Sequence, residues 1–403
     1  KQYLIHNLMI ITVVGQGYVG LPLAIAAAQA GYQVFGLDHN EEKVSLLSSG
    51  KSVIEDLNDE VIKQTIDSKL FFPTTDQSVI SRSELILICV PTPLSDGNKP
   101  DLTLLISAVT MVGRYLKLGT LVIVESTIEP GTCRNTVLPI LLEESGLKIG
   151  DVEIAYSPER IDPANKIWGI SNTPKLVAGL TENSTERALE FYKKFVGSIT
   201  TCSSVEIAET AKLLENSFRF INISFVNELA MFCEKIEIDV NEVILAAATK
   251  PYGYMPFFPS IGVGGHCIPV DPLYLANATK AVGVPSRFID LADQINQEMP
   301  GYFVGKAEAK INGLRNKKVL VVGVSYKPNV ADVRESPVES LISGLKQKGA
   351  KVYWHDDLVK EWKGEKSVAL NNHFDLAIIA TPHDYLDLTK LGNVPTLNTR
   401  GSI

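Results

Sequence analysis

The 403-residue sequence lacks three features that would assign it to large classes of protein. Its five cysteines are an odd number without a C-x-x-C pair, so neither a disulfide framework nor a zinc cage is expected. No apolar run approaches the roughly 18 residues that a membrane-spanning helix needs. The net charge is −8, whereas general nucleic-acid binders are usually basic. We therefore expect a cytoplasmic protein without membrane or nucleic-acid partners and without a bound metal.

The order of predicted strands and helices indicates an α/β protein. Apolar, β-branched runs alternate with helical patterns up to about residue 200, which is typical of a doubly wound parallel sheet. From Val205 to Glu237, apolar residues recur at helical spacing without proline or glycine. This pattern predicts one long, well-buried helix that connects domains or forms a dimer face. A second helical block is expected at 286–312, and the α/β rhythm resumes after residue 315.

The predicted fold class is therefore α/β, with two Rossmann-like doubly wound domains joined by a long central helix in a helical middle domain. The expected ranges are 1–200, 201–314 and 315–403.

The segment GQGYVG, residues Gly15 to Gly20, fits the G-x-G-x-x-G pattern between a predicted strand and a predicted helix. Gly15 allows a tight turn, Gly17 lets a pyrophosphate approach the backbone, and Gly20 lets the helix pack closely on the strand. Asp38 ends the next strand and suits a ribose 2′-hydroxyl, which favours NAD over NADP. FAD shares this fingerprint, and a glycine turn without a cofactor is the structural alternative.

Three further loops follow predicted strands, where ligands of open α/β sheets bind. They are VPTP (90–93), ESTIEPGT (125–132) and SPER, which contains Glu159 and Arg160. The first two are candidates for the nicotinamide half of the site, although their residue types also suit ordinary turns. A carboxylate at Glu159 is a candidate base, and a surface ion pair with Arg160 is the alternative.

Two more groups of residues carry candidate chemistry. Lys212 and Asn216 share one face of the predicted long helix and are candidate donors to a developing oxyanion. The alternative is that the lysine extends its ammonium to solvent or pairs with Glu209 or Glu215. In GVGGHCIPVDP, the glycines permit close approach of a ligand, and Asp271 follows Cys267 by four residues. From local chemistry alone, Cys267 is either an inert buried thiol or a nucleophile.

Together these segments resemble the nucleotide-sugar 6-dehydrogenase family, which contains the UDP-glucose and UDP-N-acetylhexosamine dehydrogenases. The resemblance extends over nearly the whole chain and follows the family's order: GQGYVGLP, CVPTP, ESTIEPGT, YSPERIDP, AETAKLLENSFRFINISFVNELA, GVGGHCIPVDPLYL and GVSYKPNVADVRESP. It implies an N-terminal NAD domain, a central helix at a homodimer interface and a C-terminal UDP-binding domain.

The resemblance also implies a role for each matching residue. Cys267 is expected to be the nucleophile of a four-electron, NAD-dependent oxidation at sugar C6. Asp271 would manage the first proton transfer together with Lys212, which with Asn216 would also stabilise the oxyanion. Glu159 would be the base for thioester hydrolysis, and Thr127 would help to hold the water.

The binding residues are expected to form two sets. Those for NAD are Gly15, Gly17, Tyr18, Val19, Gly20, Asp38, Lys43, Pro91, Thr92, Ser126, Thr127 and Arg334. Those for the UDP-sugar are Glu159, Arg160, Lys212, Asn216, Tyr252, Phe258, Ser260, Gly264 and Lys327.

The segments SPER, GGHC and TKPYGYMPFFPS depart from UDP-glucose dehydrogenases and favour a UDP-N-acetylhexosamine, foremost UDP-N-acetylglucosamine, as a precursor of surface polysaccharide. The alternatives are UDP-N-acetylmannosamine, UDP-glucose, a two-electron hydroxyacid-type dehydrogenase, and a catalytically silent nucleotide-sugar sensor.

Overall fold

The protein was analysed as a computed structural model, which describes residues 8–54, 57–162, 165 and 167–400. The chain divides into two compact units, Lys1–Leu213 and Leu214–Ile403, and the boundary falls within helix α7 (Val205–Lys235). The three domain ranges expected from the sequence stay a prediction.

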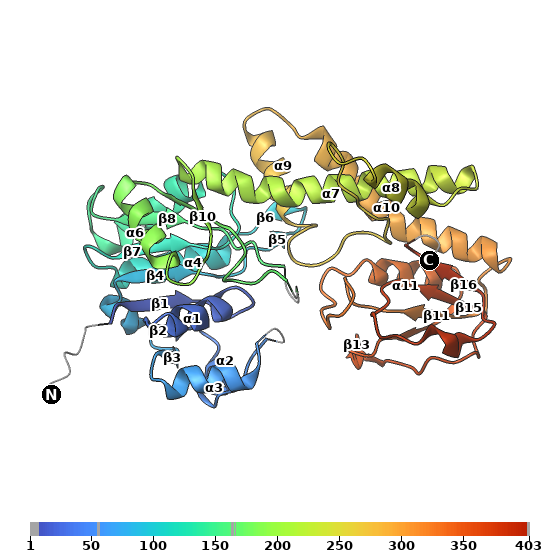
Figure 1. Cartoon of the computed structure of the whole chain (residues 1–403), viewed down its shortest axis with the longest axis horizontal. Coiled ribbons are helices and arrows are strands. Elements are labelled where there is room, and N and C mark those ends of the chain that lie inside the picture. The colour runs from blue at the N-terminus through green and yellow to red at the C-terminus, as the bar shows by residue number, and fades with distance from the viewer. Residues whose placement is uncertain (1–7, 55–56, 163–164, 166, 401–403) are drawn as a thin grey trace. The chain divides into compact units, whose positions relative to one another are not determined.

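The first unit is built on an eight-stranded sheet in the order β10-β9-β8-β7-β4-β1-β2-β3 (Figure 1). All neighbouring strands are parallel except β8 and β9, so β9 and β10 run against the rest of the sheet that the sequence predicted to be parallel. The strands are β1 (Ile10–Val14), β2 (Gln33–Leu37), β3 (Phe71–Thr74), β4 (Leu85–Ile88), β7 (Leu121–Val124), β8 (Glu153–Tyr156), β9 (Lys175–Gly179) and β10 (Ile199–Thr201). A small hairpin joins β5 (Leu94–Ser95) and β6 (Lys99–Pro100).

Both faces of this sheet are buried, because alternate residues of each central strand enter different cores. In β4, Leu85 and Leu87 face one core, and Ile86 and Ile88 face the other. The covering helices are α1 (Gly20–Gln29), α2 (Glu41–Ser48), α3 (Asp59–Asp67), α4 (Thr103–Tyr115), α5 (Leu138–Ser145) and α6 (Glu182–Tyr192), with short turns η1 (Gln77–Arg82) and η2 (Cys133–Val137). The strand order reverses direction between β1 and β4, which places a ligand-binding crevice at their carboxyl ends.

The second unit contains a four-stranded parallel sheet in the order β12-β11-β15-β16 and a set of helices. The strands are β11 (Lys318–Val322), β12 (Lys351–His355), β15 (Leu376–Ile379) and β16 (Thr396–Asn398), with a hairpin of β13 (Glu361–Trp362) and β14 (Glu365–Lys366). The helices are the rest of α7, α8 (Val240–Ala248), α9 (Asp271–Ala281), α10 (Arg287–Lys310), α11 (Val338–Gln347) and the 3₁₀ turn η3 (Leu388–Leu391). The predicted fold class is confirmed.

The long helix predicted for residues 205–237 is present as α7, but the prediction that it is well buried is wrong for one face. Phe220 and Cys233 are buried, whereas a set of large apolar side chains on α7 is exposed in the single chain. This set is Ile207, Leu214, Phe218, Phe225 and Phe232. Apolar periodicity reports that a face is hydrophobic and does not report what covers it.

Candidate active site

The glycine turn between β1 and α1 divides its three glycines between two tasks. Gly15 has φ +91°, and a Cβ there would lie 2.9 Å from the Cys89 carbonyl oxygen. A Cβ on Gly20 would lie 1.8 Å from the Gly15 carbonyl oxygen. A Cβ on Gly17 would meet no atom within 4 Å. Packing therefore demands the outer two glycines, and the surface beside Gly17 is open to a ligand.

The acidic residue at the end of β2 is held beside this turn. The Asp38 carboxylate accepts hydrogen bonds from the Gln16 amide at 2.8 Å, the Asn40 amide at 3.0 Å and the Lys43 ammonium at 2.7 Å. Burial alone would raise the pKa of Asp38, but the bond from Lys43, followed by the two amides, holds that pKa below its usual value. A carboxylate can accept about four hydrogen bonds, so capacity remains for a ribose hydroxyl.

These residues fit NAD. No side chain caps the first amides of α1, so they can receive a pyrophosphate. Tyr18 is exposed next to Gly17, and Lys43 is committed to orienting Asp38. When bound, NAD⁺ would supply a hydride acceptor at this edge of the sheet.

Two loops predicted to surround the nicotinamide are tied together. The Thr92 hydroxyl donates to the Thr127 carbonyl oxygen at 2.7 Å, and the Ser126 hydroxyl donates to the Val90 carbonyl oxygen at 2.7 Å. These loops follow β4 and β7, which are neighbours in the sheet. The structure thus brings Thr92, Ser126, Thr127 and the exposed Pro91 to the same sheet edge as the glycine turn.

The SPER loop after β8 is held by its own side chains. Glu159 Oε1 accepts the amides of Arg160 and Ile161 at 2.6 and 2.7 Å. The Arg160 guanidinium donates to the Pro174 carbonyl oxygen at 2.5 Å. Both side chains thus bond main-chain groups, and the ion pair between them stays an untested alternative.

Next to this loop lies a buried cluster that sequence reasoning missed. Glu125, 1% exposed, receives the Lys175 ammonium at 2.8 Å and the Tyr192 hydroxyl. Burial raises the pKa of Glu125 to about 7, although the Lys175 charge opposes the rise. Burial alone would lower the pKa of Lys175, but Glu125 and then Glu159 raise it overall. The available signal was a glutamate that directly follows the apolar strand β7, at a ligand-binding edge.

In the second unit, the cysteine loop and two predicted polar residues meet. Asn216 Nδ2 donates to Asp271 Oδ2 at 2.5 Å, and the Asp271 amide donates to the Cys267 carbonyl oxygen at 2.8 Å. Cys267 is exposed, whereas Asp271 is 2% exposed at the start of α9. Because Cys267 is exposed, the structure does not support the alternative that it is an inert buried thiol. Lys212 is buried on α7, one turn before Asn216, and its position relative to Cys267 stays a prediction.

The glycines that precede Cys267 pack closely against another loop of the same unit. A Cβ on Gly264 would lie 2.6 Å from the Glu335 carbonyl oxygen, and a Cβ on Gly265 would lie 2.7 Å from the Tyr326 ring. Gly265 also donates its amide to the Arg334 carbonyl oxygen at 3.2 Å. The space beside both glycines is filled by the loop after β11, so close packing of two loops of this chain requires them.

The remaining predicted binding residues of the second unit are distributed over several loops. Tyr252 and Phe258 are exposed, and the Ser260 amide donates to Asn227 Oδ1 at 2.8 Å. Lys327 is half-buried, and the Arg334 guanidinium makes bonds of 2.5 to 3.0 Å to Asp332.

Sequence reasoning missed Asn227, which is fully buried and ties the Ser260 loop to α7. A polar residue within a long apolar helical pattern was the signal that could have indicated it.

Two further observations apply to the part of the chain that the structure describes. No helix within residues 8–54, 57–162, 165 and 167–400 is both long and apolar enough to cross a bilayer. Over the same residues, no cluster of three or more His, Cys, Asp or Glu side chains is arranged to hold a metal ion.

Comparison with known proteins gives matches along the whole chain. Three models of the UDP-glucose/GDP-mannose dehydrogenase family match: the NAD binding domain at 9–196, the central domain at 206–298 and the UDP binding domain at 320–400. Protein CapL of Staphylococcus aureus is 34% identical over 394 residues, 94% of this chain and 91% of that protein. The UDP-N-acetyl-D-glucosamine 6-dehydrogenase of Salmonella typhi is 33% identical over 387 residues, 93% and 89% of the two chains.

Among solved structures, the UDP-D-ManNAc dehydrogenase of Pyrococcus horikoshii has a TM-score of 0.89 at 31% identity, and the match covers 97% of this chain and 95% of that one. Because the three models together match most of the chain, and relatives of more than 30% identity extend over nearly all of it, the chain belongs to the UDP-glucose/GDP-mannose dehydrogenase family of NAD-dependent oxidoreductases.

Proposed function

We propose that this enzyme oxidises the C6 hydroxymethyl group of a UDP-N-acetylhexosamine, foremost UDP-N-acetylglucosamine, to a carboxylate. The reaction consumes two NAD⁺ and one water for each sugar, and the product would be a precursor of surface polysaccharide. The observation that carries the proposal is the exposed Cys267, whose loop is hydrogen-bonded to the buried Asp271 and through it to Asn216. A two-electron alcohol dehydrogenase has no need of a thiol at this place.

The thiol is needed because an aldehyde carries no second hydride that it can release directly. Loss of one hydride and one proton converts the C6 alcohol to the aldehyde. The Cys267 thiolate then adds to the carbonyl carbon and gives a thiohemiacetal. Loss of a second hydride and proton gives a thioester, and attack by water breaks the C–S bond, which returns the thiol and releases the carboxylate.

We assign roles to the other residues from their resemblance to the family's motifs. Asp271 and Lys212 take part in the first deprotonation through a water, and Lys212 and Asn216 stabilise negative charge on the C6 oxygen. Asn216 already donates to Asp271, so its amide is fixed in orientation before the substrate arrives. Glu159 acts as the base for hydrolysis of the thioester, and Thr127 helps to hold the attacking water.

For the substrate, we assign the binding of UDP to Lys327 and the contacts with the sugar to Glu159, Arg160 and the loop from Tyr252 to Gly264. The choice of UDP-N-acetylglucosamine is supported by the SPER, GGHC and TKPYGYMPFFPS segments. The relatives named above include a UDP-N-acetyl-D-glucosamine 6-dehydrogenase and a UDP-D-ManNAc dehydrogenase.

We also propose that the enzyme is a homodimer through α7. Phe218, Phe225 and Phe232 follow one another at seven-residue intervals, so they lie on one face of the helix. They are 46%, 62% and 57% exposed in the single chain. A second copy of the same helix offers a matching face for a two-fold interface.

The test of the reaction is to count the NADH formed for each UDP-sugar supplied in limiting amount. UDP-N-acetylglucosamine, UDP-N-acetylmannosamine and UDP-glucose are offered separately with excess NAD⁺. We expect two NADH per molecule of the true substrate and the highest kcat/KM for UDP-N-acetylglucosamine. One NADH per sugar would identify a two-electron enzyme, and none with any of the three would reject the assignment.

Replacing Cys267 tests the nucleophile. Cys267→Ser and Cys267→Ala should abolish uronate formation, because a hydroxyl or a methyl group does not form the thioester under the same conditions. The melting temperature and the Kd for NAD⁺ should stay near those of the wild type, since the side chain is exposed. Undiminished output of uronate by either variant would show that another group is the nucleophile.

A further inference from the structure

The second unit repeats the arrangement of main-chain donors around Asp38, with a buried histidine, His383, in place of the partly buried Lys43. The Val324 amide donates to Asp356 Oδ2 at 2.9 Å, as the Gln16 amide does to Asp38 Oδ2 at 2.8 Å. The Leu358 amide donates to Asp356 Oδ1 at 3.0 Å, which matches the Asn40 amide on Asp38 Oδ1. Asp356 therefore occupies the position that a ribose-binding carboxylate has in a dinucleotide domain.

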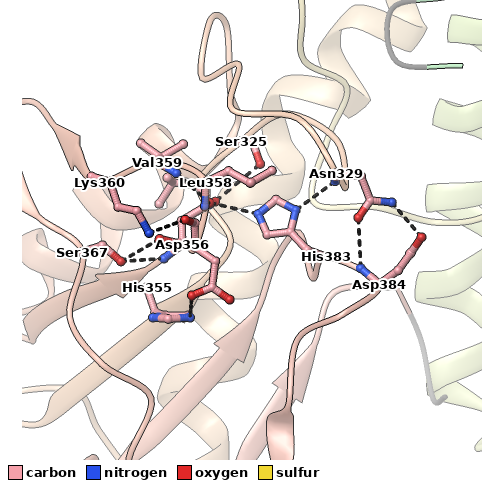
Figure 2. A network of polar contacts seen from close by, with 12 residues as sticks. Ser325, Asn329, His355, Asp356, Leu358, Val359, Lys360, Ser367, His383 and Asp384 are labelled. Atoms are coloured by element: carbon pink, nitrogen blue, oxygen red, sulfur yellow. Dashed lines mark hydrogen bonds and ion pairs between the residues drawn. The ribbon is translucent and has the colours of Figure 1, made fainter. Parts of the chain in front are cut away.

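Asp356 is nevertheless committed to the protein (Figure 2). Besides those two amides, it accepts the Val359 amide at 3.1 Å and His383 Nε2 at 2.9 Å. The side chains of His383 and Asp356 are both 0% exposed. The Ser325 hydroxyl adds a fifth, longer bond to Oδ2 at 3.5 Å. Because a carboxylate accepts about four hydrogen bonds, Asp356 has no capacity left for a ligand.

The hydrogen bonds of His383 establish its tautomer. The Asn329 amide points at His383 Nδ1 over 2.8 Å, and a main-chain N–H can only donate. Nδ1 is therefore the acceptor, and Nε2 carries the hydrogen that it donates to Asp356. The imidazole thus connects a buried carboxylate to one main-chain amide, in the way that a carboxylate orients a metal-binding or catalytic histidine.

That amide belongs to the end of the loop that carries Lys327. Asn329 has φ +64°, and two hydrogen bonds join its side chain to Asp384. Asn329 Nδ2 donates to Asp384 Oδ2 at 2.7 Å, and Asn329 Oδ1 accepts from the Asp384 amide at 3.1 Å. The beginning of the loop is held by the bond from Val324 to Asp356. One Asp356–His383 pair therefore fixes both ends of residues 324–329 (Figure 2).

The same loop also supports the cysteine loop, because the Tyr326 ring lies against Gly265, two residues before Cys267. Displacement of the loop would consequently move the Lys327 backbone and remove packing from the segment that contains the thiol.

We propose that His383, oriented by Asp356, is a positioning residue that sets the Lys327 loop for a nucleoside diphosphate. This inference rests on the role of Lys327 in the proposed function. It adds that UDP affinity depends on a buried side chain that does not itself contact the ligand.

Two variants separate the two hydrogen bonds of the ring. A glutamine amide at position 383 can reach Asp356 as Nε2 does, but it leaves the Asn329 amide without its acceptor. An asparagine places its amide oxygen where Nδ1 was and retains that acceptor, but it does not reach Asp356. For the full-length wild type and each variant, the Kd for UDP and the Kd for NAD⁺ are measured in separate titrations. The melting temperature of each protein is measured as well.

We expect His383→Gln to melt near the wild type and to bind UDP about tenfold more weakly, with unchanged affinity for NAD⁺. We expect His383→Asn to melt at a lower temperature and to keep its UDP affinity within about twofold. Equal losses of UDP affinity in both variants, or none in His383→Gln, would overturn the proposal in favour of a purely structural role.

Two controls link the effect to Lys327 and keep it distinct from the reaction. In a Lys327→Met background, His383→Gln should add no further loss of UDP affinity; an additive loss, or an unchanged UDP affinity in Lys327→Met alone, counts against the proposal. An enzyme that binds UDP with this pattern yet oxidises no UDP-sugar would reject the proposed function and leave the inference standing.

The tautomer of His383 can be measured by NMR after ¹⁵N-histidine labelling, because the chain has only six histidines to assign. A hydrogen on Nδ1 of His383 would overturn the proposal, since Nδ1 could then not accept the Asn329 amide.

Discussion

At the scale of single residues, the glycines of GQGYVG show that one motif can combine a structural and a binding requirement. A Cβ on Gly20 would collide with the Gly15 carbonyl, whereas a Cβ on Gly17 would meet nothing within 4 Å. Two alanine substitutions three residues apart should therefore behave in different ways.

We expect Gly17→Ala to melt near the wild-type temperature and to bind NAD⁺ about tenfold or more weakly, because the methyl group occupies the surface that the pyrophosphate approaches. Gly20→Ala should lower the melting temperature clearly, because main-chain atoms have to move. Calorimetry and NAD⁺ titration of both variants check this, and equal stability of the two would contradict the division of roles.

The carboxyl group of Asp356 predicts a pH dependence of stability. Burial alone would raise the pKa of Asp356, but the hydrogen bonds from His383 and then from the amides of Val324 and Val359 lower it from 3.8 to about 2. Because the pKa in the folded state is depressed, the contribution to stability is complete above about pH 4 and is lost as the pH falls toward 2. It amounts to about 2 kcal/mol.

Asp356→Asn should therefore be less stable than the wild type at pH 7, and the gap in free energy of unfolding should narrow between pH 4 and pH 2. Urea denaturation at several pH values measures it. A gap that stays constant over this range would mean that the ionisation of Asp356 does not contribute to stability.

At the scale of elements, α7 presents a pattern that a single chain does not explain. Its buried residues pack within the chain, and its exposed phenylalanines repeat every seven residues. If a second copy covers this face, a charge placed there should dissociate the dimer, since an unpaired charge in an apolar interface is costly.

We expect the wild type to sediment with twice the mass of the chain, and Phe225→Asp to sediment as a monomer. Ile149 is 83% exposed in the loop between α5 and β8 of the first unit, so Ile149→Asp is the matched control and should leave the mass unchanged. A dimeric Phe225→Asp, or a monomeric wild type, would require another role for the exposed face.

At the scale of the whole molecule, the proposed function assigns a different ligand-binding region to each compact unit. The glycine turn and Asp38 lie in the first unit, and the Lys327 loop and Cys267 lie in the second. NAD⁺ and UDP should therefore protect different segments of the chain from amide hydrogen exchange.

We expect NAD⁺ alone to slow amide exchange at residues 15–20, and UDP alone to slow it at residues 324–330, because each ligand orders the loop that it contacts. Mass spectrometry of peptides from the full-length protein resolves both regions. Protection of residues 15–20 by UDP alone would show that the assignment of ligands to units is wrong.

Much of this molecule could be predicted from local patterns. The apolar run before GQGYVG indicated β1, the helical spacing after residue 205 indicated α7, and the glycine spacing indicated a dinucleotide turn. These features depend on neighbours a few residues apart along the chain, so periodicity and turn chemistry are sufficient to predict them.

The tertiary structure alone decided how distant segments pair. Three features depend on residues that are far apart in sequence. They are the antiparallel pairing of β9 with β8, the buried ion pair of Glu125 with Lys175, and the packing of Gly265 against Tyr326. The same holds for His383 and Asp356, which lie 27 positions apart. The sequence by itself determined which elements form. The tertiary structure decided which buried polar groups pair with each other. A buried charge or amide needs a hydrogen-bond partner, and the partners available to it depend on which distant segments pack together.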